Sequence, residues 1–192
     1  MKNILIIFVK NPEKGKVKTR LAKDIGEDKA LEVYKRLLQH THDITVNLDF
    51  DKRVYYSKSV EQNDIWEDAV YDKYVQSGRE LGDKMEQAFQ SAFKQYASKV
   101  CIIGSDCLEL SGEIISHAFN QLDYFDYVVG PAKDGGYYLL GMTTHSPQLF
   151  QNKTYSTNTV CAEAISEIQQ LGGSHYLLPE LSDIDHASDL NR

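Results

Sequence analysis

A cluster of basic side chains lies near the start of a sequence that is acidic overall. Within the first 23 positions, seven of the 21 basic residues are opposed only by Glu13. They are Lys2, Lys10, Lys14, Lys16, Lys18, Arg20 and Lys23. Gly15 permits close approach to the backbone, and Thr19 can cap a following helix whose N-terminus adds partial positive charge. The loop therefore favours binding of a phosphate or diphosphate, although a solvated lysine-rich surface loop has the same composition.

Two common signatures of nucleotide binding are absent from the sequence. The Walker pattern GxxxxGK[ST] does not occur, and no GxGxxG follows the first apolar run. A phosphate site in the basic loop would therefore belong to neither of those two classes.

Aspartates supply a second kind of chemistry. Asp106 lies in GSDCLEL, residues 104–110, directly after a short apolar run. A carboxylate there can ligate Mg²⁺ or Mn²⁺, which bind carboxylate oxygens and share their other positions with phosphates and water. The structural alternative is a turn aspartate that accepts hydrogen bonds from nearby backbone amides.

Two later segments carry further carboxylates. In GPAKDGGYYLLG, Asp134 precedes a Gly–Gly pair that lets a ligand come close, and a hairpin turn explains the same residues equally well. In DIDHASDL, Asp183 and Asp185 alternate, so both side chains would point the same way in an extended chain. One basic loop together with one or two metal-binding carboxylates suits a nucleoside diphosphate or triphosphate.

Apolar periodicity predicts the elements that position these residues. Short apolar runs predict strands at residues 3–9, 53–57, 69–76, 100–104, 127–130, 136–142 and 175–178. Amphipathic stretches predict helices at residues 29–48, 81–98, 111–122 and 157–171. This alternation is typical of an α/β protein with a mainly parallel sheet covered on both faces, whose ligands bind beyond the carboxyl ends of the strands. We expect residues 1–192 to form one domain.

Composition excludes several classes of partner. The formal net charge of −7 excludes a globally cationic surface for nucleic acid or anionic lipid. No apolar stretch approaches the roughly 20 residues of a membrane span. The three cysteines lack CxxC spacing and suit a reducing compartment, so we expect a cytoplasmic protein without a disulfide framework. The sequence does not predict an oligomeric state.

The sequence resembles a bacterial family of glycosyltransferase-like proteins, grouped with 2-phospholactate guanylyltransferase and the nucleotide-diphospho-sugar transferases. The resemblance covers nearly the whole chain and runs, in order, through IFVKNPEKGKVKTRLAKDIG, QSGRELGDKM, GSDCLEL, GPAKDGGYYLLG and DIDHASDL. It implies the glycosyltransferase A fold, a three-layer α/β/α sandwich with a mixed, mostly parallel sheet. It also implies a nucleotide site over the N-terminal half of the sheet.

The resemblance assigns residues to the nucleotide. The phosphates would be faced by Lys10, Lys18 and Arg20, beside the close backbone approach at Gly15. The nucleoside would lie near Gly78, Leu81 and Gly82.

The resemblance also assigns residues to the cation and the acceptor. Asp106 would hold Mg²⁺ or Mn²⁺, with Asp185 as a candidate second ligand. Gly135 and Gly136 would line the place of the sugar or acceptor. Asp134 is the best-placed candidate for a general base.

The sequence departs from the family pattern at two places. Leu108 stands where the family usually has proline, and His186-Ala187-Ser188 replaces the usual Thr-Pro-Glu. The aspartates of both motifs survive, so the cation site is retained while the contact of the C-terminal loop with substrate is less secure.

Three hypotheses for the function follow. The first is a metal-dependent glycosyltransferase that passes a sugar from a nucleotide donor to a small acceptor. The second is a nucleotidyltransferase, similar to guanylyltransferases, that joins a nucleoside triphosphate to a phosphorylated metabolite and releases pyrophosphate. The third is a non-catalytic nucleotide-binding protein. The sequence does not identify the base, the sugar or the acceptor.

Overall fold

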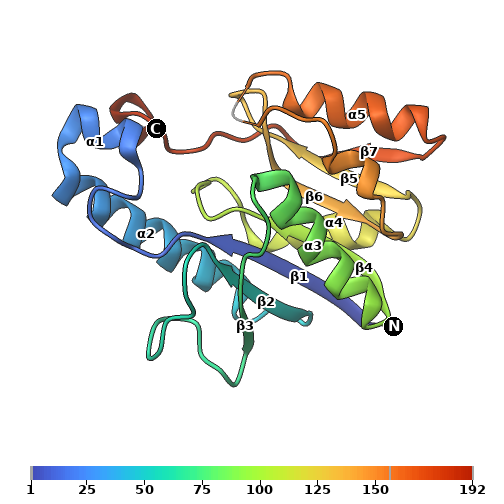
Figure 1. Cartoon of the computed structure of the whole chain (residues 1–192), viewed down its shortest axis with the longest axis horizontal. Helices are drawn as coiled ribbons and strands as arrows, with labels where there is room; N and C mark the ends of the chain where they lie inside the picture. The colour runs from blue at the N-terminus through green and yellow to red at the C-terminus, as the bar shows by residue number, and fades with distance from the viewer. Residues whose placement is uncertain (1, 156, 192) are drawn as a thin grey trace.

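The computed structural model describes residues 2–155 and 157–191, and seven strands in it form one mixed sheet (Figure 1). The strands are β1 (Lys2–Val9), β2 (Asp51–Tyr56), β3 (Tyr71–Val75), β4 (Ala97–Ile103), β5 (Tyr127–Pro131), β6 (Tyr137–Met142) and β7 (His175–Leu177). Their order across the sheet is β3-β2-β1-β4-β6-β5-β7. β1 pairs in parallel with β2 and β4, whereas β6 runs antiparallel to both of its neighbours. The prediction of a mixed, mostly parallel sheet is therefore confirmed.

Helices cover both faces of the sheet. This explains why four successive residues of β1, Ile4 to Ile7, are all buried although their side chains point alternately to the two faces. The main helices are α1 (Thr19–Ile25), α2 (Glu27–Thr45), α3 (Leu81–Lys94), α4 (Gly112–Gln121) and α5 (Val160–Gln170). Two 3-10 turns, η1 (Pro147–Phe150) and η2 (Ala187–Asn191), complete the elements. Leu5 and Ile7 pack in one core with α2 and α4, while Ile4 and Ile6 pack in a second core with α3 and α5. This three-layer arrangement confirms the predicted α/β/α fold.

Two boundaries differ from the sequence prediction. The predicted helix at residues 81–98 ends at Lys94, because Tyr96 adopts a left-handed conformation (φ 61°) and Ala97 then begins β4. Tyr96 is 90% exposed, although its spacing placed it on the apolar stripe of the helix. The short helix α1 was not predicted as a separate element. It is divided from α2 by Gly26.

The C-terminal segment crosses the molecule. After β7 it passes over the carboxyl ends of the strands and reaches α1, where the Ala187 amide donates to the Asp24 carboxylate at 3.1 Å (Figure 1). Ser111 caps α4, accepting a hydrogen bond from the Ile114 amide at 3.3 Å. In the described part of the chain, no helix has the length and apolar character needed to cross a membrane.

Candidate functional site

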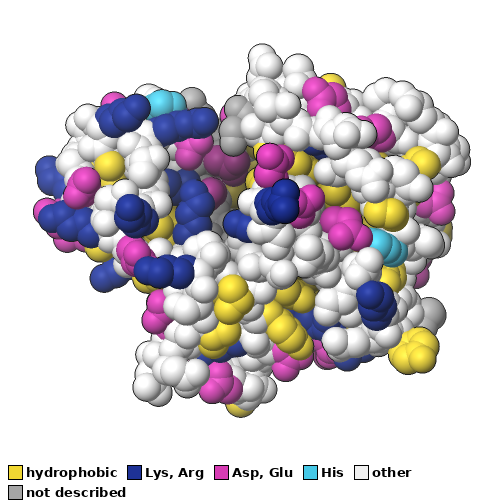
Figure 2. All heavy atoms as spheres, viewed as in Figure 1, with side chains coloured by type: hydrophobic (Ala, Val, Ile, Leu, Met, Phe, Trp, Pro, Cys, Tyr) yellow, Lys and Arg dark blue, Asp and Glu magenta, His cyan; other side chains and the backbone are white. Residues whose placement is uncertain are grey.

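A cavity of about 860 Å³ opens at the carboxyl ends of the central strands. Its walls are the loop after β1, the loop after β4, the β5–β6 turn, the start of α3 and the C-terminal segment. Figure 2 shows this hollow between the lobe that contains α1 and the rest of the molecule, with basic and acidic side chains around it. Eight of the twelve predicted site residues line it: Lys10, Lys18, Arg20, Leu81, Asp106, Asp134, Gly136 and Asp185.

Lys18 is the side chain that brings the two predicted metal ligands together. Its Nζ lies 2.8 Å from Asp106 Oδ1 and 3.3 Å from Asp185 Oδ1, and only 4% of the Lys18 side chain is exposed. Arg20 Nη1 lies 3.2 Å from the other oxygen of Asp185. Residues from three distant segments thus form one network of ion pairs.

The backbone at Lys18 directs its side chain inward. Lys18, not Thr19, is the N-cap residue of α1, and it adopts the left-handed conformation with φ 47° and ψ 46°. That conformation costs a residue with a side chain about 1–2 kcal/mol. The neighbours Val17 and Leu21 are buried, at 2% and 0% exposure, and anchor the segment on both sides.

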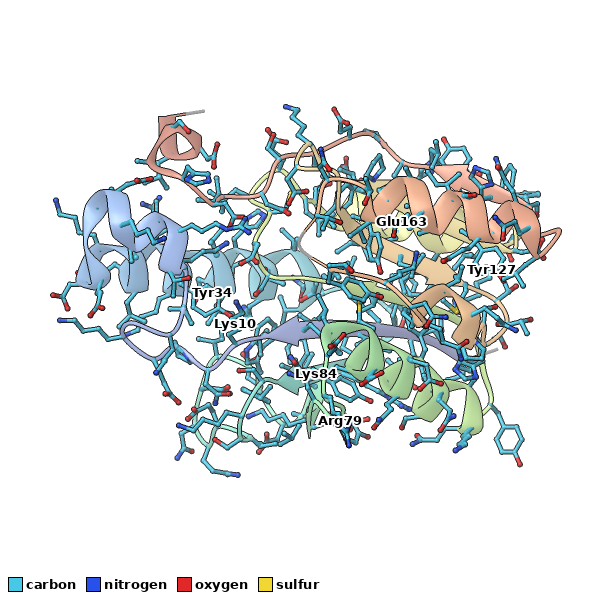
Figure 3. The ribbon with its side chains drawn as sticks, turned by 45° about the horizontal axis from the view of Figure 1, so that its top comes forward. Lys10, Tyr34, Arg79, Lys84, Tyr127 and Glu163 are labelled. Atoms are coloured by element: carbon cyan, nitrogen blue, oxygen red, sulfur yellow. The ribbon has the colours of Figure 1, made fainter. Side chains whose placement is uncertain are left out.

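Tyr34 of α2 connects the loops after β1 and β4. Its hydroxyl accepts a hydrogen bond from the Lys10 amide, donates to the Lys10 carbonyl and lies 3.4 Å from Ser105 Oγ. Figure 3 shows Tyr34 and Lys10 beside one another at the end of β1, with Lys84 near the start of α3. Burial, the largest influence, raises the pKa of the Tyr34 phenol, so this hydroxyl stays protonated and keeps its donor.

Asp183 is a cavity carboxyl that was not assigned a role from the sequence. Burial raises its pKa to about 7, and the nearby carboxylates of Asp106 and Asp134 act in the same direction. The sequence pattern that could have identified Asp183 is its alternation with Asp185, because residues two apart in an extended chain point the same way. Both side chains line the cavity. A group that titrates near neutrality can take up a proton, so Asp183 is a second candidate for acid–base chemistry beside Asp134.

Asp134 forms part of the β5–β6 turn and also lines the cavity. Its Oδ1 accepts a hydrogen bond from the Gly136 amide at 2.8 Å within the β5–β6 turn, and its side chain lines the cavity. Gly135 does not line the cavity. It adopts φ 90°, and a Cβ at this position would lie 2.1 Å from the Asn158 carbonyl oxygen, so the turn packs directly on the segment before α5.

Three other predicted glycines also lie outside the cavity lining. Gly15 lies beside the Glu27 side chain, and Gly78 lies against Asp83 and Lys84 at the start of α3. Gly82 packs against the Tyr155 ring and the Phe150 carbonyl. These contacts explain structurally why a residue without a side chain occupies each of the three positions. The role of these glycines in nucleotide binding stays a prediction.

Phenol groups on the β5–β6 side of the cavity were missed by the sequence analysis. Tyr137, Tyr138 and Tyr155 line it, and the Tyr138 hydroxyl donates to the Pro179 carbonyl at 2.9 Å. Burial raises the pKa of Tyr155 to about 12, so its phenol is neutral at physiological pH. The YY pair in residues 130–141 was the available signal, but alternation does not show which tyrosines reach a ligand.

The residues at Lys18 fit a divalent cation by the chemistry of their donors. Carboxylate oxygens from Asp106 and Asp185 converge on one positive charge, here the lysine ammonium, and Mg²⁺ and Mn²⁺ prefer such oxygens. Within residues 2–155 and 157–191, no group of three or more His, Cys, Asp or Glu side chains is arranged to hold a metal ion. A cation here would need further ligands, such as phosphate oxygens.

The fold and the cavity define an α/β enzyme of the nucleotide-diphospho-sugar transferase type. A protein from Desulfovibrio desulfuricans G20 with the provisional designation nucleotide-diphospho-sugar transferase superposes with a TM-score of 0.91 at 31% identity, over 100% of this chain and 86% of that one. This similarity confirms the predicted fold and the prediction of an enzyme.

The chain belongs to the family described as an uncharacterized protein conserved in bacteria (DUF2064), whose profile matches residues 37–157. No curated protein matches the sequence.

Two more distant structures share the fold. The bifunctional IspDF from Campylobacter jejuni has a TM-score of 0.60 at 11% identity, over 100% of this chain and 54% of that one. Rv0371c from Mycobacterium tuberculosis H37Rv, in complex with manganese, has a TM-score of 0.56 at 10% identity, over 100% of this chain and 97% of that one.

Proposed function

We propose that the protein is a metal-dependent glycosyltransferase that moves a sugar from a nucleotide sugar to a small acceptor. The observation that carries this proposal is that basic and acidic side chains from distant segments line the same cavity. Its basic side chains come from residues 10–84 and are Lys10, Lys18, Arg20 and Lys84. Its acidic side chains come from residues 106–185 and are Asp106, Asp134, Asp183 and Asp185.

These side chains suit a donor with a diphosphate and an acceptor without a phosphate. The basic side chains attract phosphates and stabilise the negative charge that develops on a departing nucleoside diphosphate. Asp134 and Asp183, in contrast, would repel an acceptor phosphate, whereas they accept hydrogen bonds from hydroxyl groups. The phenols of Tyr137 and Tyr155 add polar edges and apolar ring faces for such an acceptor.

The proposal places the donor at the basic side chains of the cavity. Lys10, Lys18 and Arg20 hold the diphosphate, with the nucleoside toward Leu81. Asp106 and Asp185 hold Mg²⁺ or Mn²⁺, which when bound neutralises phosphate charge and so stabilises the leaving group.

The acceptor lies toward the β5–β6 turn. Gly136 gives it space, and Asp134 takes the proton from its hydroxyl. In this proposal residues 1–192 form a single domain that binds both the donor and the acceptor.

Nucleotidyl transfer is the second candidate. Four positive side chains line the cavity, and their charge also suits a triphosphate. The aspartates Asp134 and Asp183 argue against nucleotidyl transfer, because their carboxylates would repel the phosphorylated acceptor that this reaction would use.

A thermal-shift panel with product analysis tests the proposal. The panel contains nucleoside triphosphates, nucleoside diphosphates and nucleotide sugars, each with and without Mg²⁺ or Mn²⁺. A ligand at a hundred times its dissociation constant adds about 2.7 kcal/mol to the free energy of unfolding, a rise of several degrees in Tm. We expect metal-dependent stabilisation by a nucleotide sugar and release of a nucleoside diphosphate on turnover. Release of pyrophosphate would establish the second candidate, and no shift with any nucleotide would remove both.

A further inference from the structure

The Lys18 ammonium lies at the place that a divalent cation would take between the two candidate ligands. It lies 2.8 Å from Asp106 Oδ1 and 3.3 Å from Asp185 Oδ1, so both carboxylates already have a positive partner. Arg20 supplies a second positive partner to Asp185, at 3.2 Å. The local formal charge of these four side chains is zero before any metal or nucleotide binds.

Lys18 is held in this place and is not a free surface lysine. Its side chain is 4% exposed, whereas that of Arg20 is 55% exposed. The left-handed backbone at φ 47° and the buried neighbours Val17 and Leu21 fix where the side chain begins. A cation that entered alone would have to push a buried ammonium away from both carboxylates.

Electrostatics make that entry unfavourable without an anion. A divalent ion between Asp106 and Asp185 would leave the Lys18 charge nearby without its partners, and an uncompensated buried charge is strongly destabilising. Phosphate oxygens change this balance, because they can accept hydrogen bonds from the displaced ammonium and also complete the coordination of the cation.

We propose that Lys18 keeps the cation site closed until a nucleotide binds, so that the divalent cation enters only together with the nucleotide phosphates. The inference rests on the proposed cation role of Asp106 and Asp185. Lys18 then has two positions, one on the carboxylates of the free protein and one on the phosphates of the complex. The consequence is an obligatory coupling between cation and nucleotide, which a site of three free carboxylates would not show.

Binding of Mn²⁺ to Lys18→Met tests the proposal without measuring activity. Methionine keeps an unbranched apolar stem and meets the same left-handed backbone cost, but it removes the ammonium. Protein-bound Mn²⁺ is measured by water-proton relaxation enhancement, first with Mn²⁺ alone and then with Mn²⁺ and each of ADP, CDP, GDP and UDP. The matched control is Lys16→Met, at an exposed lysine of the same loop that does not line the cavity.

We expect the wild type and Lys16→Met to bind Mn²⁺ only when a nucleotide is present. Lys18→Met should bind Mn²⁺ alone, at least tenfold more tightly than the wild type does. The double variant Lys18→Met/Asp106→Asn should lose this gain, because the new site uses the Asp106 carboxylate. If circular dichroism shows that Lys18→Met is unfolded, Lys18→Gln takes its place with the same expected results.

Three results would overturn the proposal, and they separate it from the proposed function. If the wild type binds Mn²⁺ alone as tightly as Lys18→Met does, Lys18 is no barrier, while the cation role stands. If the wild type binds Mn²⁺ with a nucleotide but Lys18→Met gains nothing with Mn²⁺ alone, the barrier is again absent and the cation role again stands. If no sample binds Mn²⁺ under any condition, the cation role of Asp106 and Asp185 fails together with the proposal.

Discussion

The hydroxyl of Tyr34 satisfies both backbone polar groups of Lys10. It accepts a hydrogen bond from the Lys10 amide at 2.7 Å and donates one to the Lys10 carbonyl at 3.0 Å. Tyr34 itself is 2% exposed. A residue of α2 therefore sets the direction in which the chain leaves β1, and so the position of the first predicted phosphate ligand.

Tyr34→Phe should weaken both the fold and donor binding. It removes two hydrogen bonds to part-buried backbone groups of Lys10, and each such bond contributes about 1 kcal/mol. We expect the free energy of unfolding in urea to fall by about 2 kcal/mol and the KM for the nucleotide donor to rise. Tyr124→Phe is the control, since Tyr124 is 80% exposed, and an equal loss there would disprove the explanation.

Asp106→Asn should abolish metal-dependent turnover while the protein stays folded. Asparagine keeps the shape of the side chain and Lys18 retains Asp185 as a partner, but the charge that attracts the cation is lost. We expect kcat to fall by roughly a hundredfold or more, the scale on which loss of electrostatic stabilisation acts. Asp51→Asn, at a surface carboxylate paired with Lys2, should leave kcat unchanged. Full activity of Asp106→Asn would remove Asp106 from the mechanism.

Two substitutions at Asp134 separate its turn role from its proposed chemical role. An asparagine at this position would still accept the hydrogen bond from the Gly136 amide, whereas an alanine would not. We therefore expect Asp134→Asn to lower kcat without changing Tm, and Asp134→Ala to lower both. Unchanged kcat in Asp134→Asn, measured with a saturating donor, would leave the carboxyl with the turn role alone.

Gly135→Ala should be severely destabilising. The new Cβ would lie 2.1 Å from the Asn158 carbonyl oxygen on a backbone with φ 90°, so steric overlap adds to conformational strain. Gly172→Ala is the matched control, because Gly172 has φ 71° and no atom within 4 Å of its added Cβ. Chemical denaturation should show a loss of about 1 kcal/mol at Gly172 and a clearly larger one at Gly135. Equal losses would mean that the turn can move away from Asn158.

Protonation of His42 should stabilise the fold at mildly acidic pH. Partial burial opposes its protonation, but hydrogen bonds to the Asp43 and Glu67 carboxylates outweigh burial and raise the pKa of His42. Because the folded pKa exceeds the unfolded one, this stabilisation is complete below the unfolded value of about 6.5 and disappears as pH rises through the folded value.

Unfolding free energies between pH 5 and 9 measure this contribution of His42. The wild type should lose stability across that rise in pH, and His42→Gln should show a smaller loss. His117→Gln, at an exposed histidine that contacts Tyr176, should keep the slope of the wild type. A His42→Gln slope equal to that of the wild type would contradict the prediction.

Local patterns were sufficient to predict most of the sheet. The apolar runs around β1 and β4 predict strands buried on both faces, and four successive residues of each strand are indeed buried. The end of α3 was predicted wrongly, since Tyr96 continues the helical stripe in sequence while the pairing of Ala97 with Lys2 begins a strand. That pairing joins residues 95 positions apart, which periodicity does not detect.

The candidate site could be predicted as a set of residues but not as a geometry. Lys18 was expected at the phosphates and Asp106 and Asp185 at the cation, yet nothing local predicts that one lysine would contact both carboxylates. The left-handed backbone at Lys18 was also unpredictable, because lysine does not favour it and long-range contacts hold it there. Asp183 and Tyr155 were missed as site residues because their raised pKa values come from burial and neighbouring side chains, which residue type alone does not reveal.

The contact between Lys18 and Asp185 has a consequence for synthesis of the protein. It joins residues separated by 167 positions, so the basic loop is made early while its carboxylate partner is among the last parts of this sequence to leave the ribosome. Until then Lys18 has only the Asp106 carboxylate of its two ion-pair partners. The contact between Lys18 and Asp185 therefore forms only after the central strands have been translated.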